Sequence, residues 1–170
     1  VVKAYVGVGA SVDARGTGAG IVDPQGTSFA GLAVKGLSLD AGANDEILLF
    51  AAGGAGGDEF AGAASAVVNT MSTVTEAYLA AGTQINRKNN NAGADGAQGV
   101  RVHSKGRQSI IDVAGSFAGA STAGVGLAAD VQVLNITFKA YIEPTAIVET
   151  AGDVEVDAAS EQKDLAISVA

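Results

Sequence analysis

An Ala-Tyr-aliphatic step preceded by a charged residue occurs three times in this 170-residue chain, and this repeat restricts the fold more than any other feature. The copies read KAYV, EAYL and KAYI, and their tyrosines are Tyr5, Tyr78 and Tyr141, separated by 73 and then 63 residues. Self-similarity at long spacing is typical of solenoids, in which equivalent residues of successive units stack. We therefore predict that the three tyrosines lie at one corner, in a line parallel to the solenoid axis.

Other positions of the copies agree in residue class and in distance from the tyrosine. A small turn residue follows four positions later, and a β-branched residue follows seven positions later. Each copy then reaches a glycine that opens a short alternating segment, 31, 21 and 11 residues after the tyrosine. The length differences therefore fall at one place in the unit, which predicts loops inserted at one corner of a repetitive scaffold. The turn and β-branched positions are Gly9, Gly82 and Thr145, and Val12, Ile85 and Val148.

Apolar and polar residues alternate in the segments that follow these loops, for example Val100–Val102, Val154–Val156 and Leu165–Val169. Alternation with a period of two is strand patterning, and helix periodicity is weak throughout. No Asn-Gly or Asp-Gly turn joins two strands cleanly, which disfavours a sandwich of hairpins. We predict an all-β fold, a parallel β-helix with coils about 4.8 Å apart. Each repeat is long enough for two or three coils.

Composition sets limits on function. The formal net charge is −8, which argues against nucleic-acid binding and against docking on anionic membranes. Cysteine is absent, which excludes disulfides and thiolate metal sites. No apolar run reaches the roughly 18 residues of a membrane-spanning helix.

The segments AGVGLAADVQVLNITFKAYI (123–142) and TAIVETAGDVEVDAAS (145–160) resemble the repeats of large bacterial exoproteins, the filamentous-haemagglutinin-like and autotransporter-type adhesins. Those repeats combine a Gly/Ala stretch, an Ala-Tyr-Ile step and a Gly-Asp-Val-x-Val strand. The resemblance implies a right-handed parallel β-helix, secretion to the cell surface, and an extended stalk or adhesive fibre. It carries over no catalytic residue, no cofactor and no metal.

The letters Gly56-Gly57-Asp58-Glu59-Phe60 match the signature of diguanylate cyclases, whose carboxylates help to hold Mg²⁺. The upstream elements of such enzymes are missing, and the repeat implies a different fold class. We interpret this stretch as a polar turn between β segments. The glycines of Gly16–Gly20 likewise lack the strand, helix and Lys-Ser/Thr of a phosphate loop, and they predict an ordinary loop.

His103 is the only histidine, and its alternation with Val100 and Val102 predicts an outward, solvated side chain. Four acidic residues that alternate in the last repeat also predict a solvated face, with weak Ca²⁺ binding as the alternative. These residues are Asp153, Glu155, Asp157 and Glu161.

An enzyme alternative comes from carbohydrate-active β-helices, which keep acidic and basic side chains in a cleft on one sheet. Arg101, Lys105, Arg107 and Asp112 are close enough in sequence to imitate such a cluster. Nothing comparable occurs in the other copies, so we expect no enzyme.

We therefore predict that residues 1–170 form one β-helix segment of a longer exoprotein, with degenerate repeats beginning near 3, 76 and 139. The expected function is a structural and adhesive stalk module, extracellular or on the bacterial cell surface. Loops 15–35 and 87–98 are the candidate contact sites for host-cell or surface glycans and proteins. Neighbouring repeats of the same polypeptide are the other expected partners.

Overall fold

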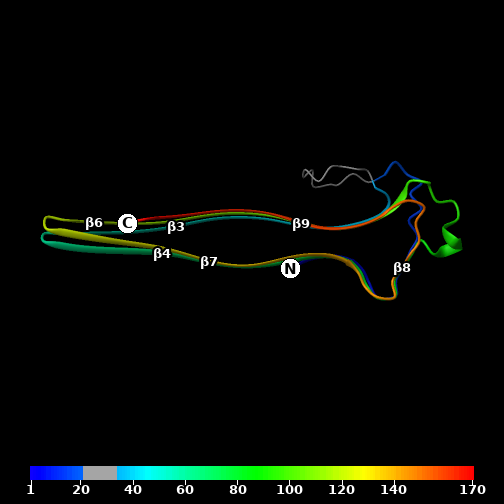
Figure 1. The fold of residues 1–170 in the computed structure, drawn as a ribbon, viewed down its shortest axis with the longest axis horizontal. Coiled ribbons are helices and arrows are strands. Elements are labelled where there is room, and N and C mark those ends of the chain that lie inside the picture. Colours follow the sequence, from blue (N-terminus) through cyan, green and yellow to red (C-terminus); the bar gives the residue numbers. More distant parts are fainter. Residues whose placement is uncertain (21–33) are drawn as a thin grey trace. The chain divides into compact units, whose positions relative to one another are not determined.

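The computed structural model describes residues 1–20 and 34–170, which form nine strands, one 3₁₀ segment, η1 (Lys88–Asn91), and the turns and loops between them. The strands associate in three parallel sheets with the orders β1-β4-β7, β2-β5-β8 and β3-β6-β9, so each sheet takes one strand from each of three coils (Figure 1). The predicted all-β parallel β-helix is confirmed. The strands are β1 (Val2–Val6), β2 (Ser11–Val12), β3 (Lys35–Gly57), β4 (Phe60–Leu79), β5 (Gln84–Ile85), β6 (Gln98–Ala120), β7 (Ala123–Ile142), β8 (Ile147–Val148) and β9 (Val154–Val169).

The register of the coils follows the sequence repeat. Tyr5 pairs with Tyr78 in the β1–β4 ladder, and the two rings stack with centroids 5.2 Å apart. The Tyr78 and Tyr141 rings stack with centroids 4.9 Å apart and parallel planes. Both distances are close to the 4.7–4.9 Å separation of hydrogen-bonded strands. The predicted line of three tyrosines is therefore confirmed.

The number of coils per repeat differs from the expectation. Each repeat makes a single coil, because β4 of the second repeat pairs directly with β1 of the first. Four strands are 20 to 23 residues long. Their length accounts for the residues that were expected to form two or three coils. The glycines and alanines within β3 do not end the strand, since small residues fit extended backbone as well as turns.

One corner of the coil is built from the turn positions of the repeat. Gly9, Gly82 and Thr145 all have positive φ, at 67°, 71° and 69°. The β-branched residue three positions later then enters the short sheet β2-β5-β8, where Val12 pairs with Ile85 and Ile85 with Val148. The corner conformation is therefore repeated in every coil, although a threonine replaces glycine in the third.

The strands divide into two compact units, each supplied by all three coils. The first unit holds an apolar core of buried side chains from all three sheets, including Val6, Leu79, Ile85, Val100 and Val102. The first unit consists of Val1–Ala43, Val74–Gly106 and Thr137–Ser160, and the second of Asn44–Thr73, Arg107–Ile136 and Glu161–Ala170.

The second unit has an unusual distribution of side chains. Its interior contains polar groups beside apolar ones: Asn69, Gln108 and Asp112 are buried together with Val67 and Ile110. Its outward positions carry many exposed apolar side chains. These include Leu48, Phe50, Phe117, Leu127 and Ile167. Alternation alone would have put the larger apolar set inside.

Backbones of successive strands approach closely near the turns of the second unit. A Cβ on Gly53 would lie 2.3 Å from the Ala64 carbonyl oxygen, and one on Gly124 would lie 2.3 Å from the Ala118 carbonyl oxygen. Only glycine fits at such distances. The Gly/Ala composition therefore lets two consecutive strands pack with almost no side chain between them.

Thr145→Gly should raise the free energy of unfolding by about 1 kcal/mol, because it removes a β-branched residue from the left-handed region. Gly82→Thr is the matched reverse change and should lower it. A Cβ on Gly82 would meet nothing closer than 3.8 Å, so the Cβ itself causes no crowding there. Urea unfolding of both variants measures this; equal signs would contradict the assigned corner.

Gly53→Ala should lower the free energy of unfolding by about 1–3 kcal/mol, because the new methyl group overlaps the Ala64 carbonyl. The neighbouring Gly54→Ala is the control, since a Cβ there meets nothing within 4 Å. Chemical denaturation of the two variants distinguishes a steric overlap at position 53 from a general destabilisation by alanine in β3. If the two variants unfold alike, the close approach of the backbones is wrong.

Candidate functional site

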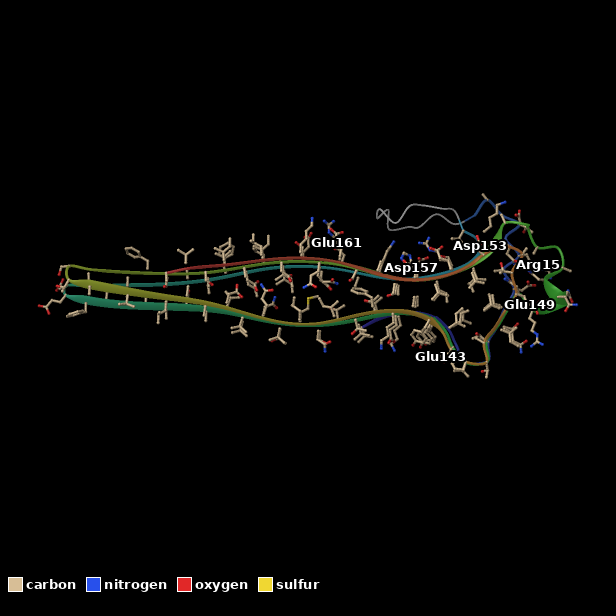
Figure 2. All side chains as sticks on the ribbon, in the orientation of Figure 1. Arg15, Glu143, Glu149, Asp153, Asp157 and Glu161 are labelled. Atoms are coloured by element: carbon tan, nitrogen blue, oxygen red, sulfur yellow. The ribbon has the colours of Figure 1, made fainter. Side chains whose placement is uncertain are left out.

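A group of charged side chains lies on the outer face of the sheet β3-β6-β9 in the first unit. Val100 and Val102 of β6 belong to the core, so Arg101 and His103 project from the opposite face. β3 adds Asp40 beside His103, and β9 adds Asp157 on the other side. Figure 2 shows Asp153 and Asp157 on the side of β9 that faces away from the core.

Polar contacts hold His103 from three directions. Its Nδ1 lies 3.4 Å from Asp40 Oδ1, and its Nε2 lies 3.4 Å from Asp157 Oδ2. The Arg101 guanidinium lies 2.9 Å from the same Nδ1, at hydrogen-bond distance. The Ser38 hydroxyl donates to Asp40. His103 therefore joins three neighbouring strands of the sheet.

His103 was expected to be solvated, and this is wrong: only 1% of its surface is exposed. The outward direction is right, but outward does not mean accessible here. β6 is the middle strand, so side chains of both neighbouring strands flank the ring, and Arg101 and Lys105 lie before and after it on the same face. Arg101 and Lys105 are themselves only 6% and 4% exposed.

The four alternating acidic residues of the last repeat are exposed, as predicted, and two of them, Glu155 and Glu161, also pair with arginines of β6. Glu155 Oε2 lies 3.8 Å from Arg101 Nε, and Glu161 Oε1 lies 3.6 Å from Arg107 Nη2. Among the described residues, no group of three or more His, Cys, Asp or Glu side chains is arranged to hold a metal ion.

The cluster suggested for a carbohydrate-active enzyme is not brought together. Arg101 lies on the outer face of β6 in the first unit, whereas Asp112 is fully buried inside the second. The two positions differ by an odd number along one strand, so their side chains leave opposite faces. Arg107 is half exposed and pairs with Glu161.

Asp112, which the sequence suggested as part of that cluster, is a buried carboxyl next to a second one, Asp130, that the sequence pattern did not single out. Burial raises the pKa of Asp112, and the nearby Asp130 carboxylate raises it further, against the Asn69 and Gln132 amides, which lower it. These two amides are near enough to act on the Asp112 charge but do not reach hydrogen-bond geometry, so all four carboxylate oxygens of Asp112 and Asp130 are buried without a hydrogen-bond partner in the described structure. Only knowledge of which strand face is internal would have identified this pair.

The cyclase-like letters form the turn that was predicted. β3 ends at Gly57, Asp58 and Glu59 make the bend, and β4 begins at Phe60. The equivalent turn of the next coil stacks on it, because the backbone N–H groups of Ser121 and Thr122 donate to the carbonyls of Asp58 and Glu59. The motif is therefore a coil corner.

The candidate contact loops are joined to each other where the structure describes them; residues 21–33 lie outside the described part. Asp95 pairs with Lys35 at 2.9 Å, and its backbone N–H donates to the Arg15 carbonyl. The Ala97 backbone N–H and then Lys35 hold the pKa of Asp95 below its usual value. Gly16, from the glycine-rich stretch, has φ +69° and packs against Lys35.

Gln98 fixes the end of the second loop. It is fully buried, and its side-chain amide donates to the Ala14 carbonyl and accepts from the Ala151 backbone N–H. It thereby connects the same corner of all three coils. The exposed basic pair Arg87 and Lys88 remains at the surface of this loop.

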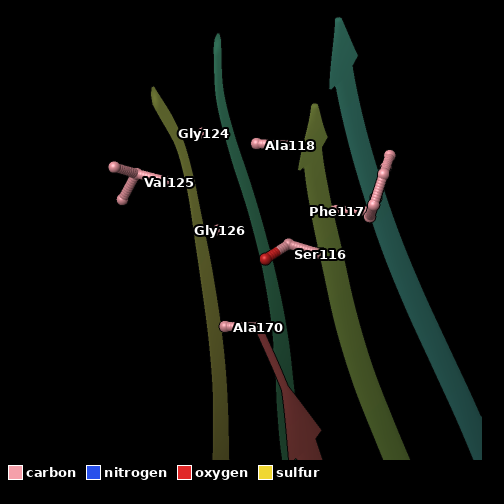
Figure 3. Close-up of a pocket in the computed structure, with 7 residues that line it drawn as sticks. All are labelled: Ser116, Phe117, Ala118, Gly124, Val125, Gly126 and Ala170. Atoms are coloured by element: carbon pink, nitrogen blue, oxygen red, sulfur yellow. The ribbon is translucent and has the colours of Figure 1, made fainter. Parts of the chain in front are cut away.

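A hollow of about 440 Å³ lies in the second unit, where β6 and β7 continue past the end of β9 (Figure 3). Its lining contains one hydroxyl, from Ser116, and no titratable side chain. The lining residues are Ser116, Phe117, Ala118, Gly124, Val125, Gly126 and Ala170.

No protein-family model, no curated protein and no solved structure matches this chain. No helix within the described ranges is both long enough and apolar enough to cross a bilayer.

Asp112→Asn should raise the free energy of unfolding at neutral pH by about 1 kcal/mol, because it removes a buried carboxylate that no hydrogen bond satisfies. A raised pKa means that the folded state holds the proton more tightly. The stability contributed by Asp112 is therefore full below its ordinary pKa and is lost as pH rises through the folded value. The gain from the variant should shrink toward zero in acid.

Denaturation of wild type and Asp112→Asn between about pH 3 and pH 8 measures this difference. Asp58→Asn, in the exposed turn, is the control and should change little at any pH. A variant that is less stable than wild type at neutral pH would show that the carboxylate has a favourable partner.

Proposed function

We propose that this chain is a structural and adhesive stalk module of a large bacterial surface or secreted protein. The observation that carries the proposal is the in-register stacking of three coils, seen in the continuous column Tyr5, Tyr78 and Tyr141. Equivalent strands of successive coils are hydrogen-bonded neighbours in all three sheets. Such stacking distributes a load over many backbone bonds and needs no bound group.

Side-chain columns support the same proposal. Lys3 lies 2.8 Å from Glu76, whose other oxygen lies 3.9 Å from Lys139. The hydrogen bond that Lys3 donates to the Glu76 carboxylate raises the pKa of Lys3 above its ordinary value. Charges of alternating sign therefore follow the stack, beside the tyrosines, and favour the native register of the coils.

Contacts with other molecules are assigned to the corner loops, because the chain varies in length only there. The loop over 87–98 carries Arg87 and Lys88, an exposed basic pair on a chain of net charge −8. A basic pair of this kind suits an acidic surface glycan. The chain is thus expected outside the cell, at the bacterial surface.

A carbohydrate-active enzyme is the second candidate, and one observation favours it. His103 lies between the carboxylates of Asp40 and Asp157, an arrangement in which a carboxylate orients a base. Its almost complete burial opposes this reading, since a base must reach its substrate. We therefore place it second.

The test measures binding and turnover on the same chain. We expect retention on immobilised sulfated or sialylated glycans, and no release of reducing or unsaturated sugar from a polysaccharide panel. Arg87→Ser with Lys88→Ser should weaken binding several-fold. Arg107→Ser with Lys163→Ser makes the same charge change outside the loops and should not.

Two outcomes would contradict the proposal. Sugar release that disappears in His103→Ala would favour the enzyme. Equal loss of binding in both double variants would show that retention reflects overall charge and not the loop.

A further inference from the structure

The outward face of β4 and β7 in the second unit is uncharged over its whole length and mostly apolar. It consists of the even-numbered residues 60–72 and the odd-numbered residues 125–135, which alternate with internal positions such as Val67 and Asn69. We call it the β4–β7 face. Its large apolar members are 49–71% exposed: Phe60, Val68, Val125, Leu127, Val131 and Val133.

No charged side chain belongs to this face. Residues 60–72 contain none, and the one charged residue of 125–135, Asp130, is on the internal side. The remaining outward positions are glycine, alanine, threonine, serine and asparagine: Gly62, Ala64, Ala66, Thr70, Ser72, Ala129 and Asn135. The face is therefore uncharged on a chain whose net charge is −8.

Strands that are apolar on both sides are typical of parallel sheets covered on both faces. A soluble monomer rarely exposes a continuous apolar patch of more than a few hundred Å². The β4–β7 face is about 40 Å long and about 10 Å wide, from strand rise and spacing. A surface of this kind indicates a protein partner.

We propose that a second copy of this chain covers the β4–β7 face, in a symmetric face-to-face dimer. Charge selects this occupant. Two copies at −8 repel each other wherever acidic surfaces meet, but they meet here without bringing like charges together. In a symmetric dimer, each row of small residues also meets the identical row of the second copy, which has the same residue spacing. A basic or acidic partner would find no complementary charge.

The opposite outer face of the second unit is less suited to dimerisation. Its apolar residues, such as Phe50 and Ile167, border on Glu46, Arg107, Glu161 and Lys163. The β4–β7 face has only two strands, and about 400 Å² from each copy gives about 800 Å² in total, which lies among weak, transient interfaces. We expect a dimer with a dissociation constant in the micromolar range.

Sedimentation velocity of the full 170-residue chain from about 1 to about 200 µM tests the proposal. We expect a monomer–dimer equilibrium that strengthens when salt screens the net charge. Val131→Lys should weaken dimerisation at least tenfold, and Val131→Thr, which keeps the β-branched shape, should weaken it less. Ile167→Lys puts the same charge on the opposite outer face and should leave the equilibrium unchanged. Circular dichroism verifies folding of each variant.

Several results would overturn the proposal. These are a monomer throughout the concentration range, a dimer that Val131→Lys leaves intact, or one that Ile167→Lys abolishes. Open-ended growth insensitive to Val131 would assign association to strand edges. Flotation of a monomer with phosphatidylcholine vesicles would assign the face to lipid.

Discussion

Hydrogen bonding between equivalent strands of successive coils is the constraint on which this structure depends. Once Tyr5 pairs with Tyr78, the residues that follow as far as Val12 have their partners fixed about 4.8 Å away, before the loops of unequal length. The repeat in the sequence is the consequence, since a residue that suits one coil must suit the coil beside it. Similar rings therefore stack, corners share one backbone conformation, and lysine alternates with glutamate.

The features that the sequence predicted are those set by this pairing. The tyrosine column, the turn at Gly9, Gly82 and Thr145, and the bend at Asp58-Glu59 all follow from comparing copies with one another. Comparison cannot give the number of coils in a repeat. That number depends on whether glycine and alanine interrupt a strand, and in β3 they extend it.

The candidate site was harder to predict because it depends on which side of a strand is internal and on what flanks it. His103 was placed outward correctly, yet the neighbouring Asp40 and Asp157 make that outer position a buried one. Asp112 shows the opposite error. Its strand segment carries apolar residues on both sides, so alternation gives no preference, and the acid lies inside.

The corner that holds the long loops also affects the rate of folding. A tyrosine meets its neighbour only after 63 or 73 residues, so native pairing closes long loops and folding should be slow. The cost of closure rises only with the logarithm of loop length, and the ten extra residues of the first coil add about 0.1 kcal/mol. Lengthening the chain at that corner therefore costs almost no stability. A surface loop at that corner can be lengthened, shortened or replaced in evolution without a change in the stacked scaffold.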